Sequence, residues 1–225
     1  KGLFGVNNQQ TYNVLRDQNL QEVDVFDDLL LTFYGNGEEV GQDIHTGKTV
    51  HRTRAYDWDT GQHYNRTSAI LRYEDGYFMV RSGEKESVFL YFDVKQLQWT
   101  VIQTFPYHVN HLALHDEKIY LPSERGFGIY NIEQKSMDWI NEFPLVDGRK
   151  VQTDCNMIAF DRQDGMWIGT EDRGVLYSRP TKLQFNSYPV PSPEADHYSK
   201  MMDEMVQNIT EFHCLRANCM FMDSR

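Results

Sequence analysis

Apolar and polar residues alternate with a period of two along most of the chain, which is the pattern of β-strands with one buried face. Acidic or glycine-containing turns separate the alternating segments. One such pair is Ile70-Leu71 and Tyr77–Val80, with Glu74-Asp75-Gly76 as the turn between them. These patterns predict an all-β protein built largely from hairpins.

The hairpin pattern recurs along the chain. The segments Asn110–Asp116, Asn156–Asp161 and Asn218–Asp223 each begin with asparagine, alternate apolar residues and end at an acid. The hairpin turns are 47, 42 and 47 residues apart, counted between Asp28, Asp75, Glu117 and Asp164. A repeat of this length with antiparallel hairpins is typical of a β-propeller blade.

The repeat predicts a β-propeller fragment of four-stranded antiparallel blades. A single four-stranded sheet cannot cover both of its faces, whereas neighbouring blades cover one another. Third and fourth strands are expected at 126–131 and 137–140, and again at 87–93 and 98–102. A β-sandwich is the alternative, but sandwich strands do not repeat at blade length.

The predicted organisation is a single partial propeller over residues 1–225. It comprises about four blades and an incomplete blade at each end, as expected for a piece of a longer protein. Residues 193–209 predict a short helical insertion near the C-terminus, because Ser192 can cap a helix that begins at Pro193. Its apolar stripe is more typical of a segment that covers a propeller edge than of a partner-docking face: Tyr198, Met202, Met205 and Ile209.

Composition narrows the function classes for these 225 residues. The net charge of −11 disfavours nucleic acid and direct membrane contact as partners. The chain has no apolar run of the roughly 18–20 residues that cross a bilayer. Three cysteines are too few for a disulfide framework, although pairing of Cys214 with Cys219 stays open.

We expect no metal and no cofactor. His111 and His115 share a strand face at a separation of about 13 Å, whereas His108 points the other way, so the three do not converge as zinc ligands must. Asp57–Gly61 begins like a calcium loop but lacks the later ligands, and Gly35-Asn36-Gly37 reads as a hairpin turn. No motif of a catalytic nucleophile is present, and we expect no catalytic residues.

Residues 51–66 are rich in aromatic and charged side chains. Sugars bind by stacking on aromatic rings while arginine and carboxylate groups hydrogen-bond their hydroxyls. The alternative is an ordinary solvated outer strand with its loop. The candidate ligand-binding residues are Arg54, Tyr56, Trp58, Tyr64 and Arg66 here, with Arg125 and Arg173 in turns that follow second strands.

The segment Ile158–Thr170, followed by Gly174–Tyr177, resembles the two-component-regulator propeller repeat. This resemblance implies the sensor region of a hybrid two-component system of the Bacteroidetes type. The resemblance further implies a periplasmic glycan sensor that is coupled through a membrane helix to a cytoplasmic histidine kinase. The blades at 23–60 and 68–105 depart from the repeat because they lack its Trp-x-Gly-Thr strand.

The functional hypothesis is therefore a non-catalytic periplasmic sensor fragment that takes an oligosaccharide ligand. Its expected partners are the remaining blades, a membrane-proximal module and a second copy of the chain. A propeller enzyme acting on polysaccharide, as a lyase or glycosidase, and a protein-binding scaffold are the alternatives. For packing, we expect Trp167 between blades, with Trp99 and Trp139 less buried on outer strands.

Overall fold

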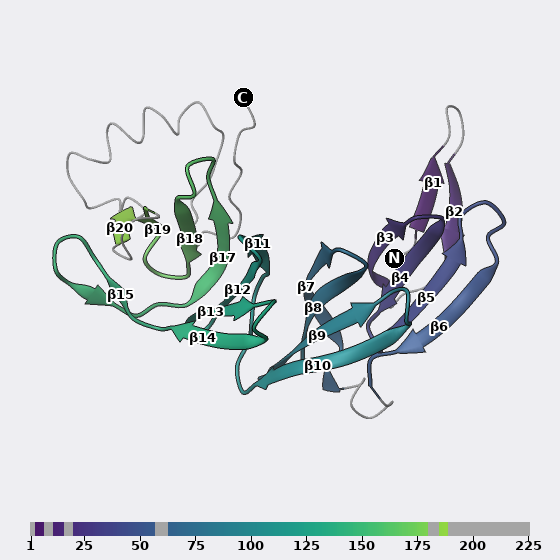
Figure 1. The fold of residues 1–225 in the computed structure, drawn as a ribbon, viewed down its shortest axis with the longest axis horizontal. Coiled ribbons are helices and arrows are strands. Elements are labelled where there is room, and N and C mark those ends of the chain that lie inside the picture. Colours follow the sequence, from purple (N-terminus) through teal and green to yellow (C-terminus); the bar gives the residue numbers. More distant parts are fainter. Residues whose placement is uncertain (1–2, 7–10, 16–19, 57–62, 180–184, 189–225) are drawn as a thin grey trace. The chain divides into compact units, whose positions relative to one another are not determined.

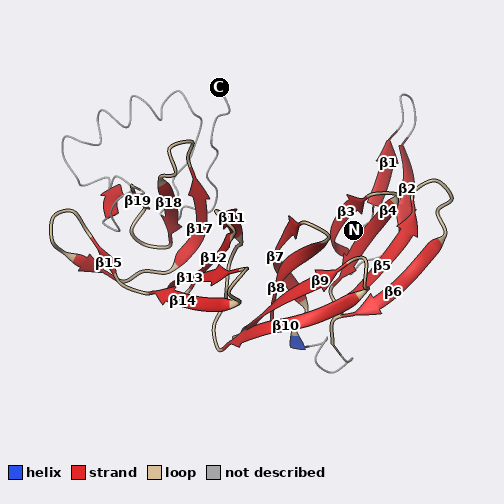
Figure 2. Cartoon of the chain, viewed as in Figure 1, coloured by secondary structure: helices blue, strands red, loops and turns tan. Residues whose placement is uncertain are grey.

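The computed structural model of the chain describes residues 3–6, 11–15, 20–56, 63–179 and 185–188. Its named elements are all β-strands, and the helical colour in Figure 2 is confined to a short piece at His63. Among these residues the strands form four four-stranded antiparallel sheets and two two-stranded hairpins (Figure 1). The fold is a β-propeller fragment, as the sequence predicts. The predicted helical insertion at 193–209, together with Cys214 and Cys219, lies outside the described residues.

The chain divides into two compact units, Lys1–Val109 and Asn110–Arg225. The first unit contains two complete sheets, ordered β3-β4-β5-β6 and β10-β9-β8-β7, and the hairpin β1-β2. Its strands are β1 Leu3–Val6, β2 Thr11–Leu15, β3 Leu20–Phe26, β4 Leu29–Tyr34, β5 Glu38–Asp43, β6 Thr49–Arg54, β7 Arg66–Tyr73, β8 Gly76–Ser82, β9 Ser87–Asp93 and β10 Gln98–Phe105.

The second unit also contains two complete sheets, ordered β11-β12-β13-β14 and β17-β18-β19-β20, and the hairpin β15-β16. Its strands are β11 Ala113–His115, β12 Lys118–Ser123, β13 Gly126–Asn131, β14 Ser136–Ile140, β15 Phe143–Pro144, β16 Lys150–Val151, β17 Cys155–Phe160, β18 Met166–Thr170, β19 Val175–Ser178 and β20 Phe185–Tyr188. That all of residues 1–225 belong to one partial propeller stays a prediction.

Every complete sheet turns from its first to its second strand at an acidic residue, and this confirms the predicted repeat. Asp27, Glu74 and Asp164 have φ values of 51°, 47° and 61°. The third sheet uses Asp116 and Glu117, at 47° and 55°. These left-handed conformations allow the short reversal that brings the second strand back beside the first. The predicted turn at Gly35–Gly37 is also confirmed, between β4 and β5, with φ +81° at Gly37.

Within each unit the two complete sheets bury an apolar cluster between them, as blades of a propeller do. In the first unit the cluster takes residues from both sheets: Phe26, Leu31, Phe33, Tyr77, Met79, Phe92 and Val94. In the second unit it also takes residues from β15 and the connection that follows: Phe127, Phe143, Leu145, Cys155, Ile158, Met166, Ile168, Leu176 and Phe185.

The tryptophans share one degree of burial. Trp99, Trp139 and Trp167 are all half-buried, so the expected ranking of their burial stays a prediction. Trp99 does lie on the outer strand β10, but its ring folds inward onto Phe92, at 4.5 Å between centroids. Trp167 donates from Nε1 to Asp161 Oδ2 at 3.0 Å, a contact within its own sheet.

A buried polar network joins the two complete sheets of the first unit. The Glu39 side chain is fully buried, and His51 Nε2 lies 3.0 Å from its Oε1. Thr53 Oγ1 donates to Glu39 Oε2 at 3.0 Å. Trp99 Nε1, from the other sheet, donates to Thr53 Oγ1 at 3.0 Å. The network therefore satisfies a carboxylate that would be costly to bury alone.

Candidate ligand-binding site

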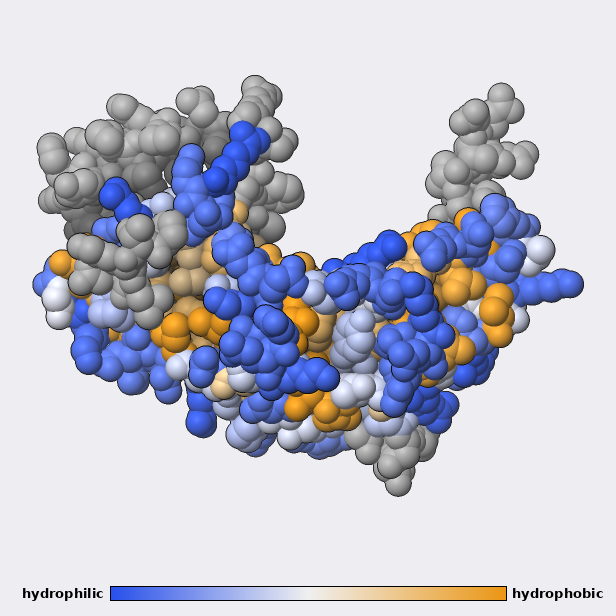
Figure 3. All heavy atoms as spheres, in the orientation of Figure 1, coloured by the Kyte–Doolittle hydropathy of each residue, from blue (hydrophilic) through white to orange (hydrophobic). Residues whose placement is uncertain are grey.

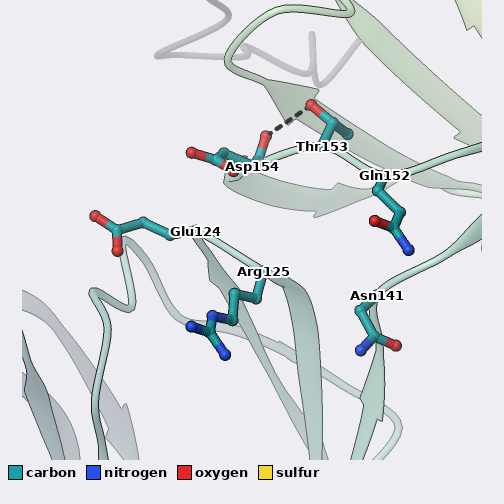
Figure 4. Close-up of a pocket in the computed structure, with 6 residues that line it drawn as sticks. All are labelled: Glu124, Arg125, Asn141, Gln152, Thr153 and Asp154. Atoms are coloured by element: carbon teal, nitrogen blue, oxygen red, sulfur yellow. Dashed lines mark hydrogen bonds between the residues drawn. The ribbon is translucent and has the colours of Figure 1, made fainter.

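A polar pocket of about 360 Å³ lies in the second unit (Figure 4). Its residues come from three connections: the turn between β12 and β13, the residue after β14, and the segment that leads into β17. They are Glu124, Arg125, Asn141, Gln152, Thr153 and Asp154. All except Thr153 are exposed, so their side chains are accessible to a ligand.

The first rim turn, Ser123–Gly126, holds Glu124 and Arg125 at the pocket. Ser123 Oγ donates to Gly126 O at 3.1 Å and accepts from Arg125 N at 3.1 Å. Gly126 has φ +91°, and a Cβ atom there would meet Ile140 O at 2.1 Å. The hydroxyl and the glycine together fix this turn, so the two charged residues start from a defined backbone.

The next blade repeats this arrangement in a second rim turn, Thr170–Gly174. Thr170 Oγ1 donates to Gly174 O at 2.8 Å and accepts from Arg173 N at 3.0 Å. Both rim turns thus place acidic residues, one in the first turn and two in the second, and then an arginine between a hydroxyl residue and a glycine. The repeat of the fold therefore extends to the chemistry of its turns.

The second rim turn also supports the wall of the pocket. Thr153 Oγ1 donates to Asp172 Oδ1 at 2.6 Å, and Asp154 O accepts from Glu171 N at 3.0 Å. Asp172 in turn pairs with Arg173 Nε at 3.3 Å. These contacts fix the segment that carries Gln152, Thr153 and Asp154, so the pocket is set by the packing of two neighbouring blades.

Acidic charge dominates around the pocket. Burial raises the pKa of Asp154, and the nearby charges of Glu124, Glu171 and Asp172 raise it further. Three other carboxylates therefore act on Asp154, whereas Arg125 and Arg173 are the two arginines of the rim turns. The lining is entirely polar, and carboxylate, amide, hydroxyl and guanidinium groups suit a ligand rich in hydroxyl groups.

The candidate residues of 51–66 lie in the first unit. Arg54 is on the outer strand β6, exposed, with Nη2 3.8 Å from Glu38 Oε1. Arg66 is exposed at the start of β7. Arg54 therefore agrees with the solvated outer strand that the sequence left open as the alternative, whereas Arg66 lies on the first strand of the next sheet. Trp58 lies outside the described residues.

Tyr56 and Tyr64 come together, but in a packed cluster around Arg81. Tyr64 is 7% exposed, so its ring offers no face for stacking, which corrects that part of the prediction. Arg81 is 1% exposed and donates from Nη2 to Tyr64 O at 3.0 Å and to Gly35 O at 2.6 Å. Its Nε donates to the Tyr56 hydroxyl. Burial raises the pKa of Tyr56, and Arg81 partly offsets this.

Sequence reasoning found Arg125 and Arg173 in the rim turns but missed their surroundings. Asn141, Gln152 and Asp154 have no motif around them, and only folding brings them to Arg125 (Figure 4). Arg81 carried a signal, because it continues the apolar run of β8, whose seven residues are all buried. A charged residue in such a run indicates an internal hydrogen-bond network.

The described residues show no group of three or more His, Cys, Asp or Glu side chains that could hold a metal ion. His115 instead stacks on Phe160, at 4.0 Å between ring centroids. Among the described residues, the large hydrophobic side chains that are exposed are Val25, Ile44, Val50, Leu97, Val101, Leu114 and Val146. Figure 3 shows hydrophobic and hydrophilic residues intermixed on one face of the molecule. Within the described ranges, no helix is long and apolar enough to span a lipid bilayer.

The sequence matches no protein-family model and no curated protein. Among solved structures, the chain is similar to the extracellular domain of a hybrid two-component system of B. thetaiotaomicron, with a TM-score of 0.57 and 15% identity over 83% of this chain and 25% of that one. A second similar structure is an extracellular domain described as that of a one-component system from the same bacterium. Its TM-score is 0.54, with 14% identity over 80% of this chain and 23% of that one.

The computationally designed Ika4 protein is also similar, with a TM-score of 0.52 and 12% identity over 73% of this chain and 93% of that one. The chain spans about a quarter of the length of the bacterial domains. At these identities the likeness shows the fold, and it agrees with the four-stranded blades described above.

Proposed function

We propose that this chain is part of the periplasmic sensor domain of a hybrid two-component regulator, and that it binds a glycan-derived ligand without altering it chemically. The observation that carries the proposal is the likeness of the fold, at a TM-score of 0.57, to the extracellular domain of such a system. The repeat at Ile158–Thr170, which resembles that of two-component regulators, supports it independently.

The polar pocket of the second unit, called the rim pocket from here on, supports the ligand class. Its amide, hydroxyl and carboxylate groups can each exchange hydrogen bonds with sugar hydroxyls, which both donate and accept. Because the pocket wall is formed by two neighbouring blades, a ligand there would bias how these blades pack. In the parent protein, such a bias would pass through the membrane-proximal module to a cytoplasmic histidine kinase.

One observation favours a second candidate, a glycosidase. Glu124 and Asp154 place two carboxyl groups around one pocket, and the pKa of Asp154 is raised, as a general acid requires. A glycosidase consumes its ligand, whereas a sensor returns it unchanged. Product formation therefore separates the two candidates.

The test is calorimetry of the 225-residue chain against a panel of disaccharides to hexasaccharides, followed by chromatography of each incubated mixture. The proposal expects saturable binding and unchanged oligosaccharide. Shorter products, absent in Asp154→Asn, would establish the glycosidase instead. Absence of binding to every member of a broad panel would remove the glycan from the proposal.

Two variants locate the ligand. Arg125→Ala should weaken binding by about 1–3 kcal/mol if the pocket of the second unit is the site. Trp58→Ala should do so if residues 51–66 are the site, because it removes an aromatic candidate for stacking. Each variant is the control for the other, and loss of binding in one alone assigns the ligand to one unit.

A further inference from the structure

We infer that the rim pocket selects neutral, hydroxyl-rich sugar residues and rejects uronic acid and sulfated ones. This inference rests on the proposed function and adds to it the chemical class of the ligand. It is carried by which charges surround the pocket and by how firmly the structure holds them.

The carboxylates outnumber the cations at this site. Glu124 and Asp154 line the pocket with a single arginine, Arg125. The second rim turn adds Glu171 and Asp172, and their charges reach Asp154. A negatively charged ligand would therefore enter a site that is already acidic, and like charges brought together cost several kcal/mol unless they are solvated or paired.

The acidic groups of the second rim turn are fixed by hydrogen bonds. Asp172 accepts from Thr153 Oγ1 at 2.6 Å and pairs with Arg173. Glu171 Oε2 accepts from Asn156 Nδ2 at 3.3 Å. Because these contacts engage Asp172 and Glu171 in the folded structure, an entering anion cannot displace the two carboxylates without breaking them.

Arg173 does not offset this charge for a ligand. Its Nε lies 3.3 Å from Asp172 Oδ2, so part of its charge is already neutralised by a carboxylate of the same turn. Arg125 would have to balance the remaining acids as well as bind an anionic ligand. Neutral hydroxyl groups meet no such conflict, because they donate to the carboxylates and accept from Arg125 and the amides of Asn141 and Gln152.

The size of the pocket agrees with a short segment of a sugar chain. Its volume of about 360 Å³ lies near the lower end of the roughly 300–1,000 Å³ found for small-molecule sites. A longer ligand that reached the second rim turn would meet acidic residues again. A longer sugar chain should therefore show the same preference for neutral residues.

The test compares neutral oligosaccharides with matched acidic ones: galacto-oligosaccharides against oligogalacturonates, and neutral against sulfated galacto-oligosaccharides. Calorimetry at low salt should show the neutral ligand binding at least roughly tenfold tighter. The double variant Glu124→Gln with Asp154→Asn should narrow this ratio, because both changes remove charge while retaining hydrogen-bonding groups. Glu133→Gln is the matched control, an exposed acid at the opposite end of β13.

Each outcome bears on one level of the proposal. Tighter binding of the acidic ligand, or an unchanged ratio in the double variant, would overturn this inference and leave glycan binding intact. Absence of binding by every ligand would overturn the proposed function itself. If the double variant fails to fold, the salt dependence of the unmodified chain decides: screening should narrow the ratio as ionic strength rises, and a constant ratio would overturn the inference.

Discussion

Gly126 shows how one residue can set the geometry of the first rim turn. Its φ of +91° lies where side chains other than glycine rarely occur, and the position of a Cβ atom is already taken by the carbonyl oxygen of Ile140. Gly148 has a similar φ of +86°, but nothing lies within 4 Å of its Cβ position. Comparison of the two glycines therefore separates two effects: the backbone conformation is unfavourable at both positions, whereas a Cβ atom would be crowded only at Gly126.

Gly126→Ala should therefore lower the free energy of unfolding by more than Gly148→Ala does. The unfavourable φ alone costs about 1 kcal/mol, and displacement of the β14 backbone adds to it at Gly126. Urea unfolding of both variants and the unmodified chain measures the difference. Equal losses would mean that the turn yields to the new methyl group without strain.

Glu39 makes stability depend on pH. Burial raises its pKa above the ordinary value of 4.5, and the charge and hydrogen bonds of His51 and Thr53 only partly oppose this. The folded chain therefore binds a proton at Glu39 more tightly than the unfolded chain does. The resulting contribution is complete below pH 4.5 and is lost as pH rises through the raised pKa.

Glu39→Gln tests this directly. The free energy of unfolding of the unmodified chain, minus that of the variant, should fall as pH rises from 4.5 upward, because the glutamine does not ionise. Urea unfolding at a series of pH values provides the measurement, with Glu133→Gln as a control for loss of one charge. A difference that rises with pH would show that the pairing with His51 outweighs burial.

At the scale of elements, the indole of Trp99 connects β10 to β6 of the neighbouring sheet. It stacks on Phe92 and also donates to Thr53, so its ring and its N–H act on different partners. Replacement can separate these contributions, because phenylalanine keeps a ring for stacking and lacks the donor.

Trp99→Phe should lower the free energy of unfolding by about 0.5–1.5 kcal/mol, the usual net value of one hydrogen bond. Trp99→Ala should lower it by about 3–5 kcal/mol, since it also empties the space over Phe92. Thermal or urea unfolding distinguishes the two. A phenylalanine variant as stable as the unmodified chain would assign the whole effect to stacking.

The sequence predicts the strands well where local pattern decides them. The expected segments 87–93 and 126–131 match β9 and β13 at both ends, because turns with strong local preferences bound them. The expected strand at Asn110–Asp116 is shorter, as β11 begins at Ala113. Asn110 instead donates from its side chain to Cys155 O at 2.9 Å, a contact with the next blade that no local pattern contains.

The candidate site was harder to predict from the sequence, because contacts between sheets bring its residues together and no local pattern contains such contacts. Arg125 and Arg173 could be predicted because each follows a recognisable second strand. Gln152 and Asp154 come from a connection without a motif, and their approach to Arg125 depends on packing between sheets. The aromatic residues at 51–66 predicted a stacking surface for sugars, and for Tyr64 this was wrong, because Tyr64 packs against the buried Arg81.

At the scale of the molecule, the chain consists of two compact units, and the rim pocket belongs to the second. A ligand that binds only the folded state stabilises it by about 2.7 kcal/mol at a free concentration of 100 times its Kd. Amide hydrogen exchange should therefore slow in residues 110–179 when a pocket ligand is added. Residues 20–56 should keep their exchange rates, and equal slowing in both would show that the units open together.

The thiol of Cys155 makes it possible to measure how often the structure next to the pocket opens. Its thiol is fully buried directly after Thr153 and Asp154, and burial raises its pKa to about 12. A thiol reagent can thus reach it only during brief excursions in which the blades separate, so the labelling rate counts those excursions. In a chain with Cys214 and Cys219 replaced by serine, Cys155 is the single thiol, so its labelling rate measures how often the blades separate. A ligand bound in the pocket should lower that rate.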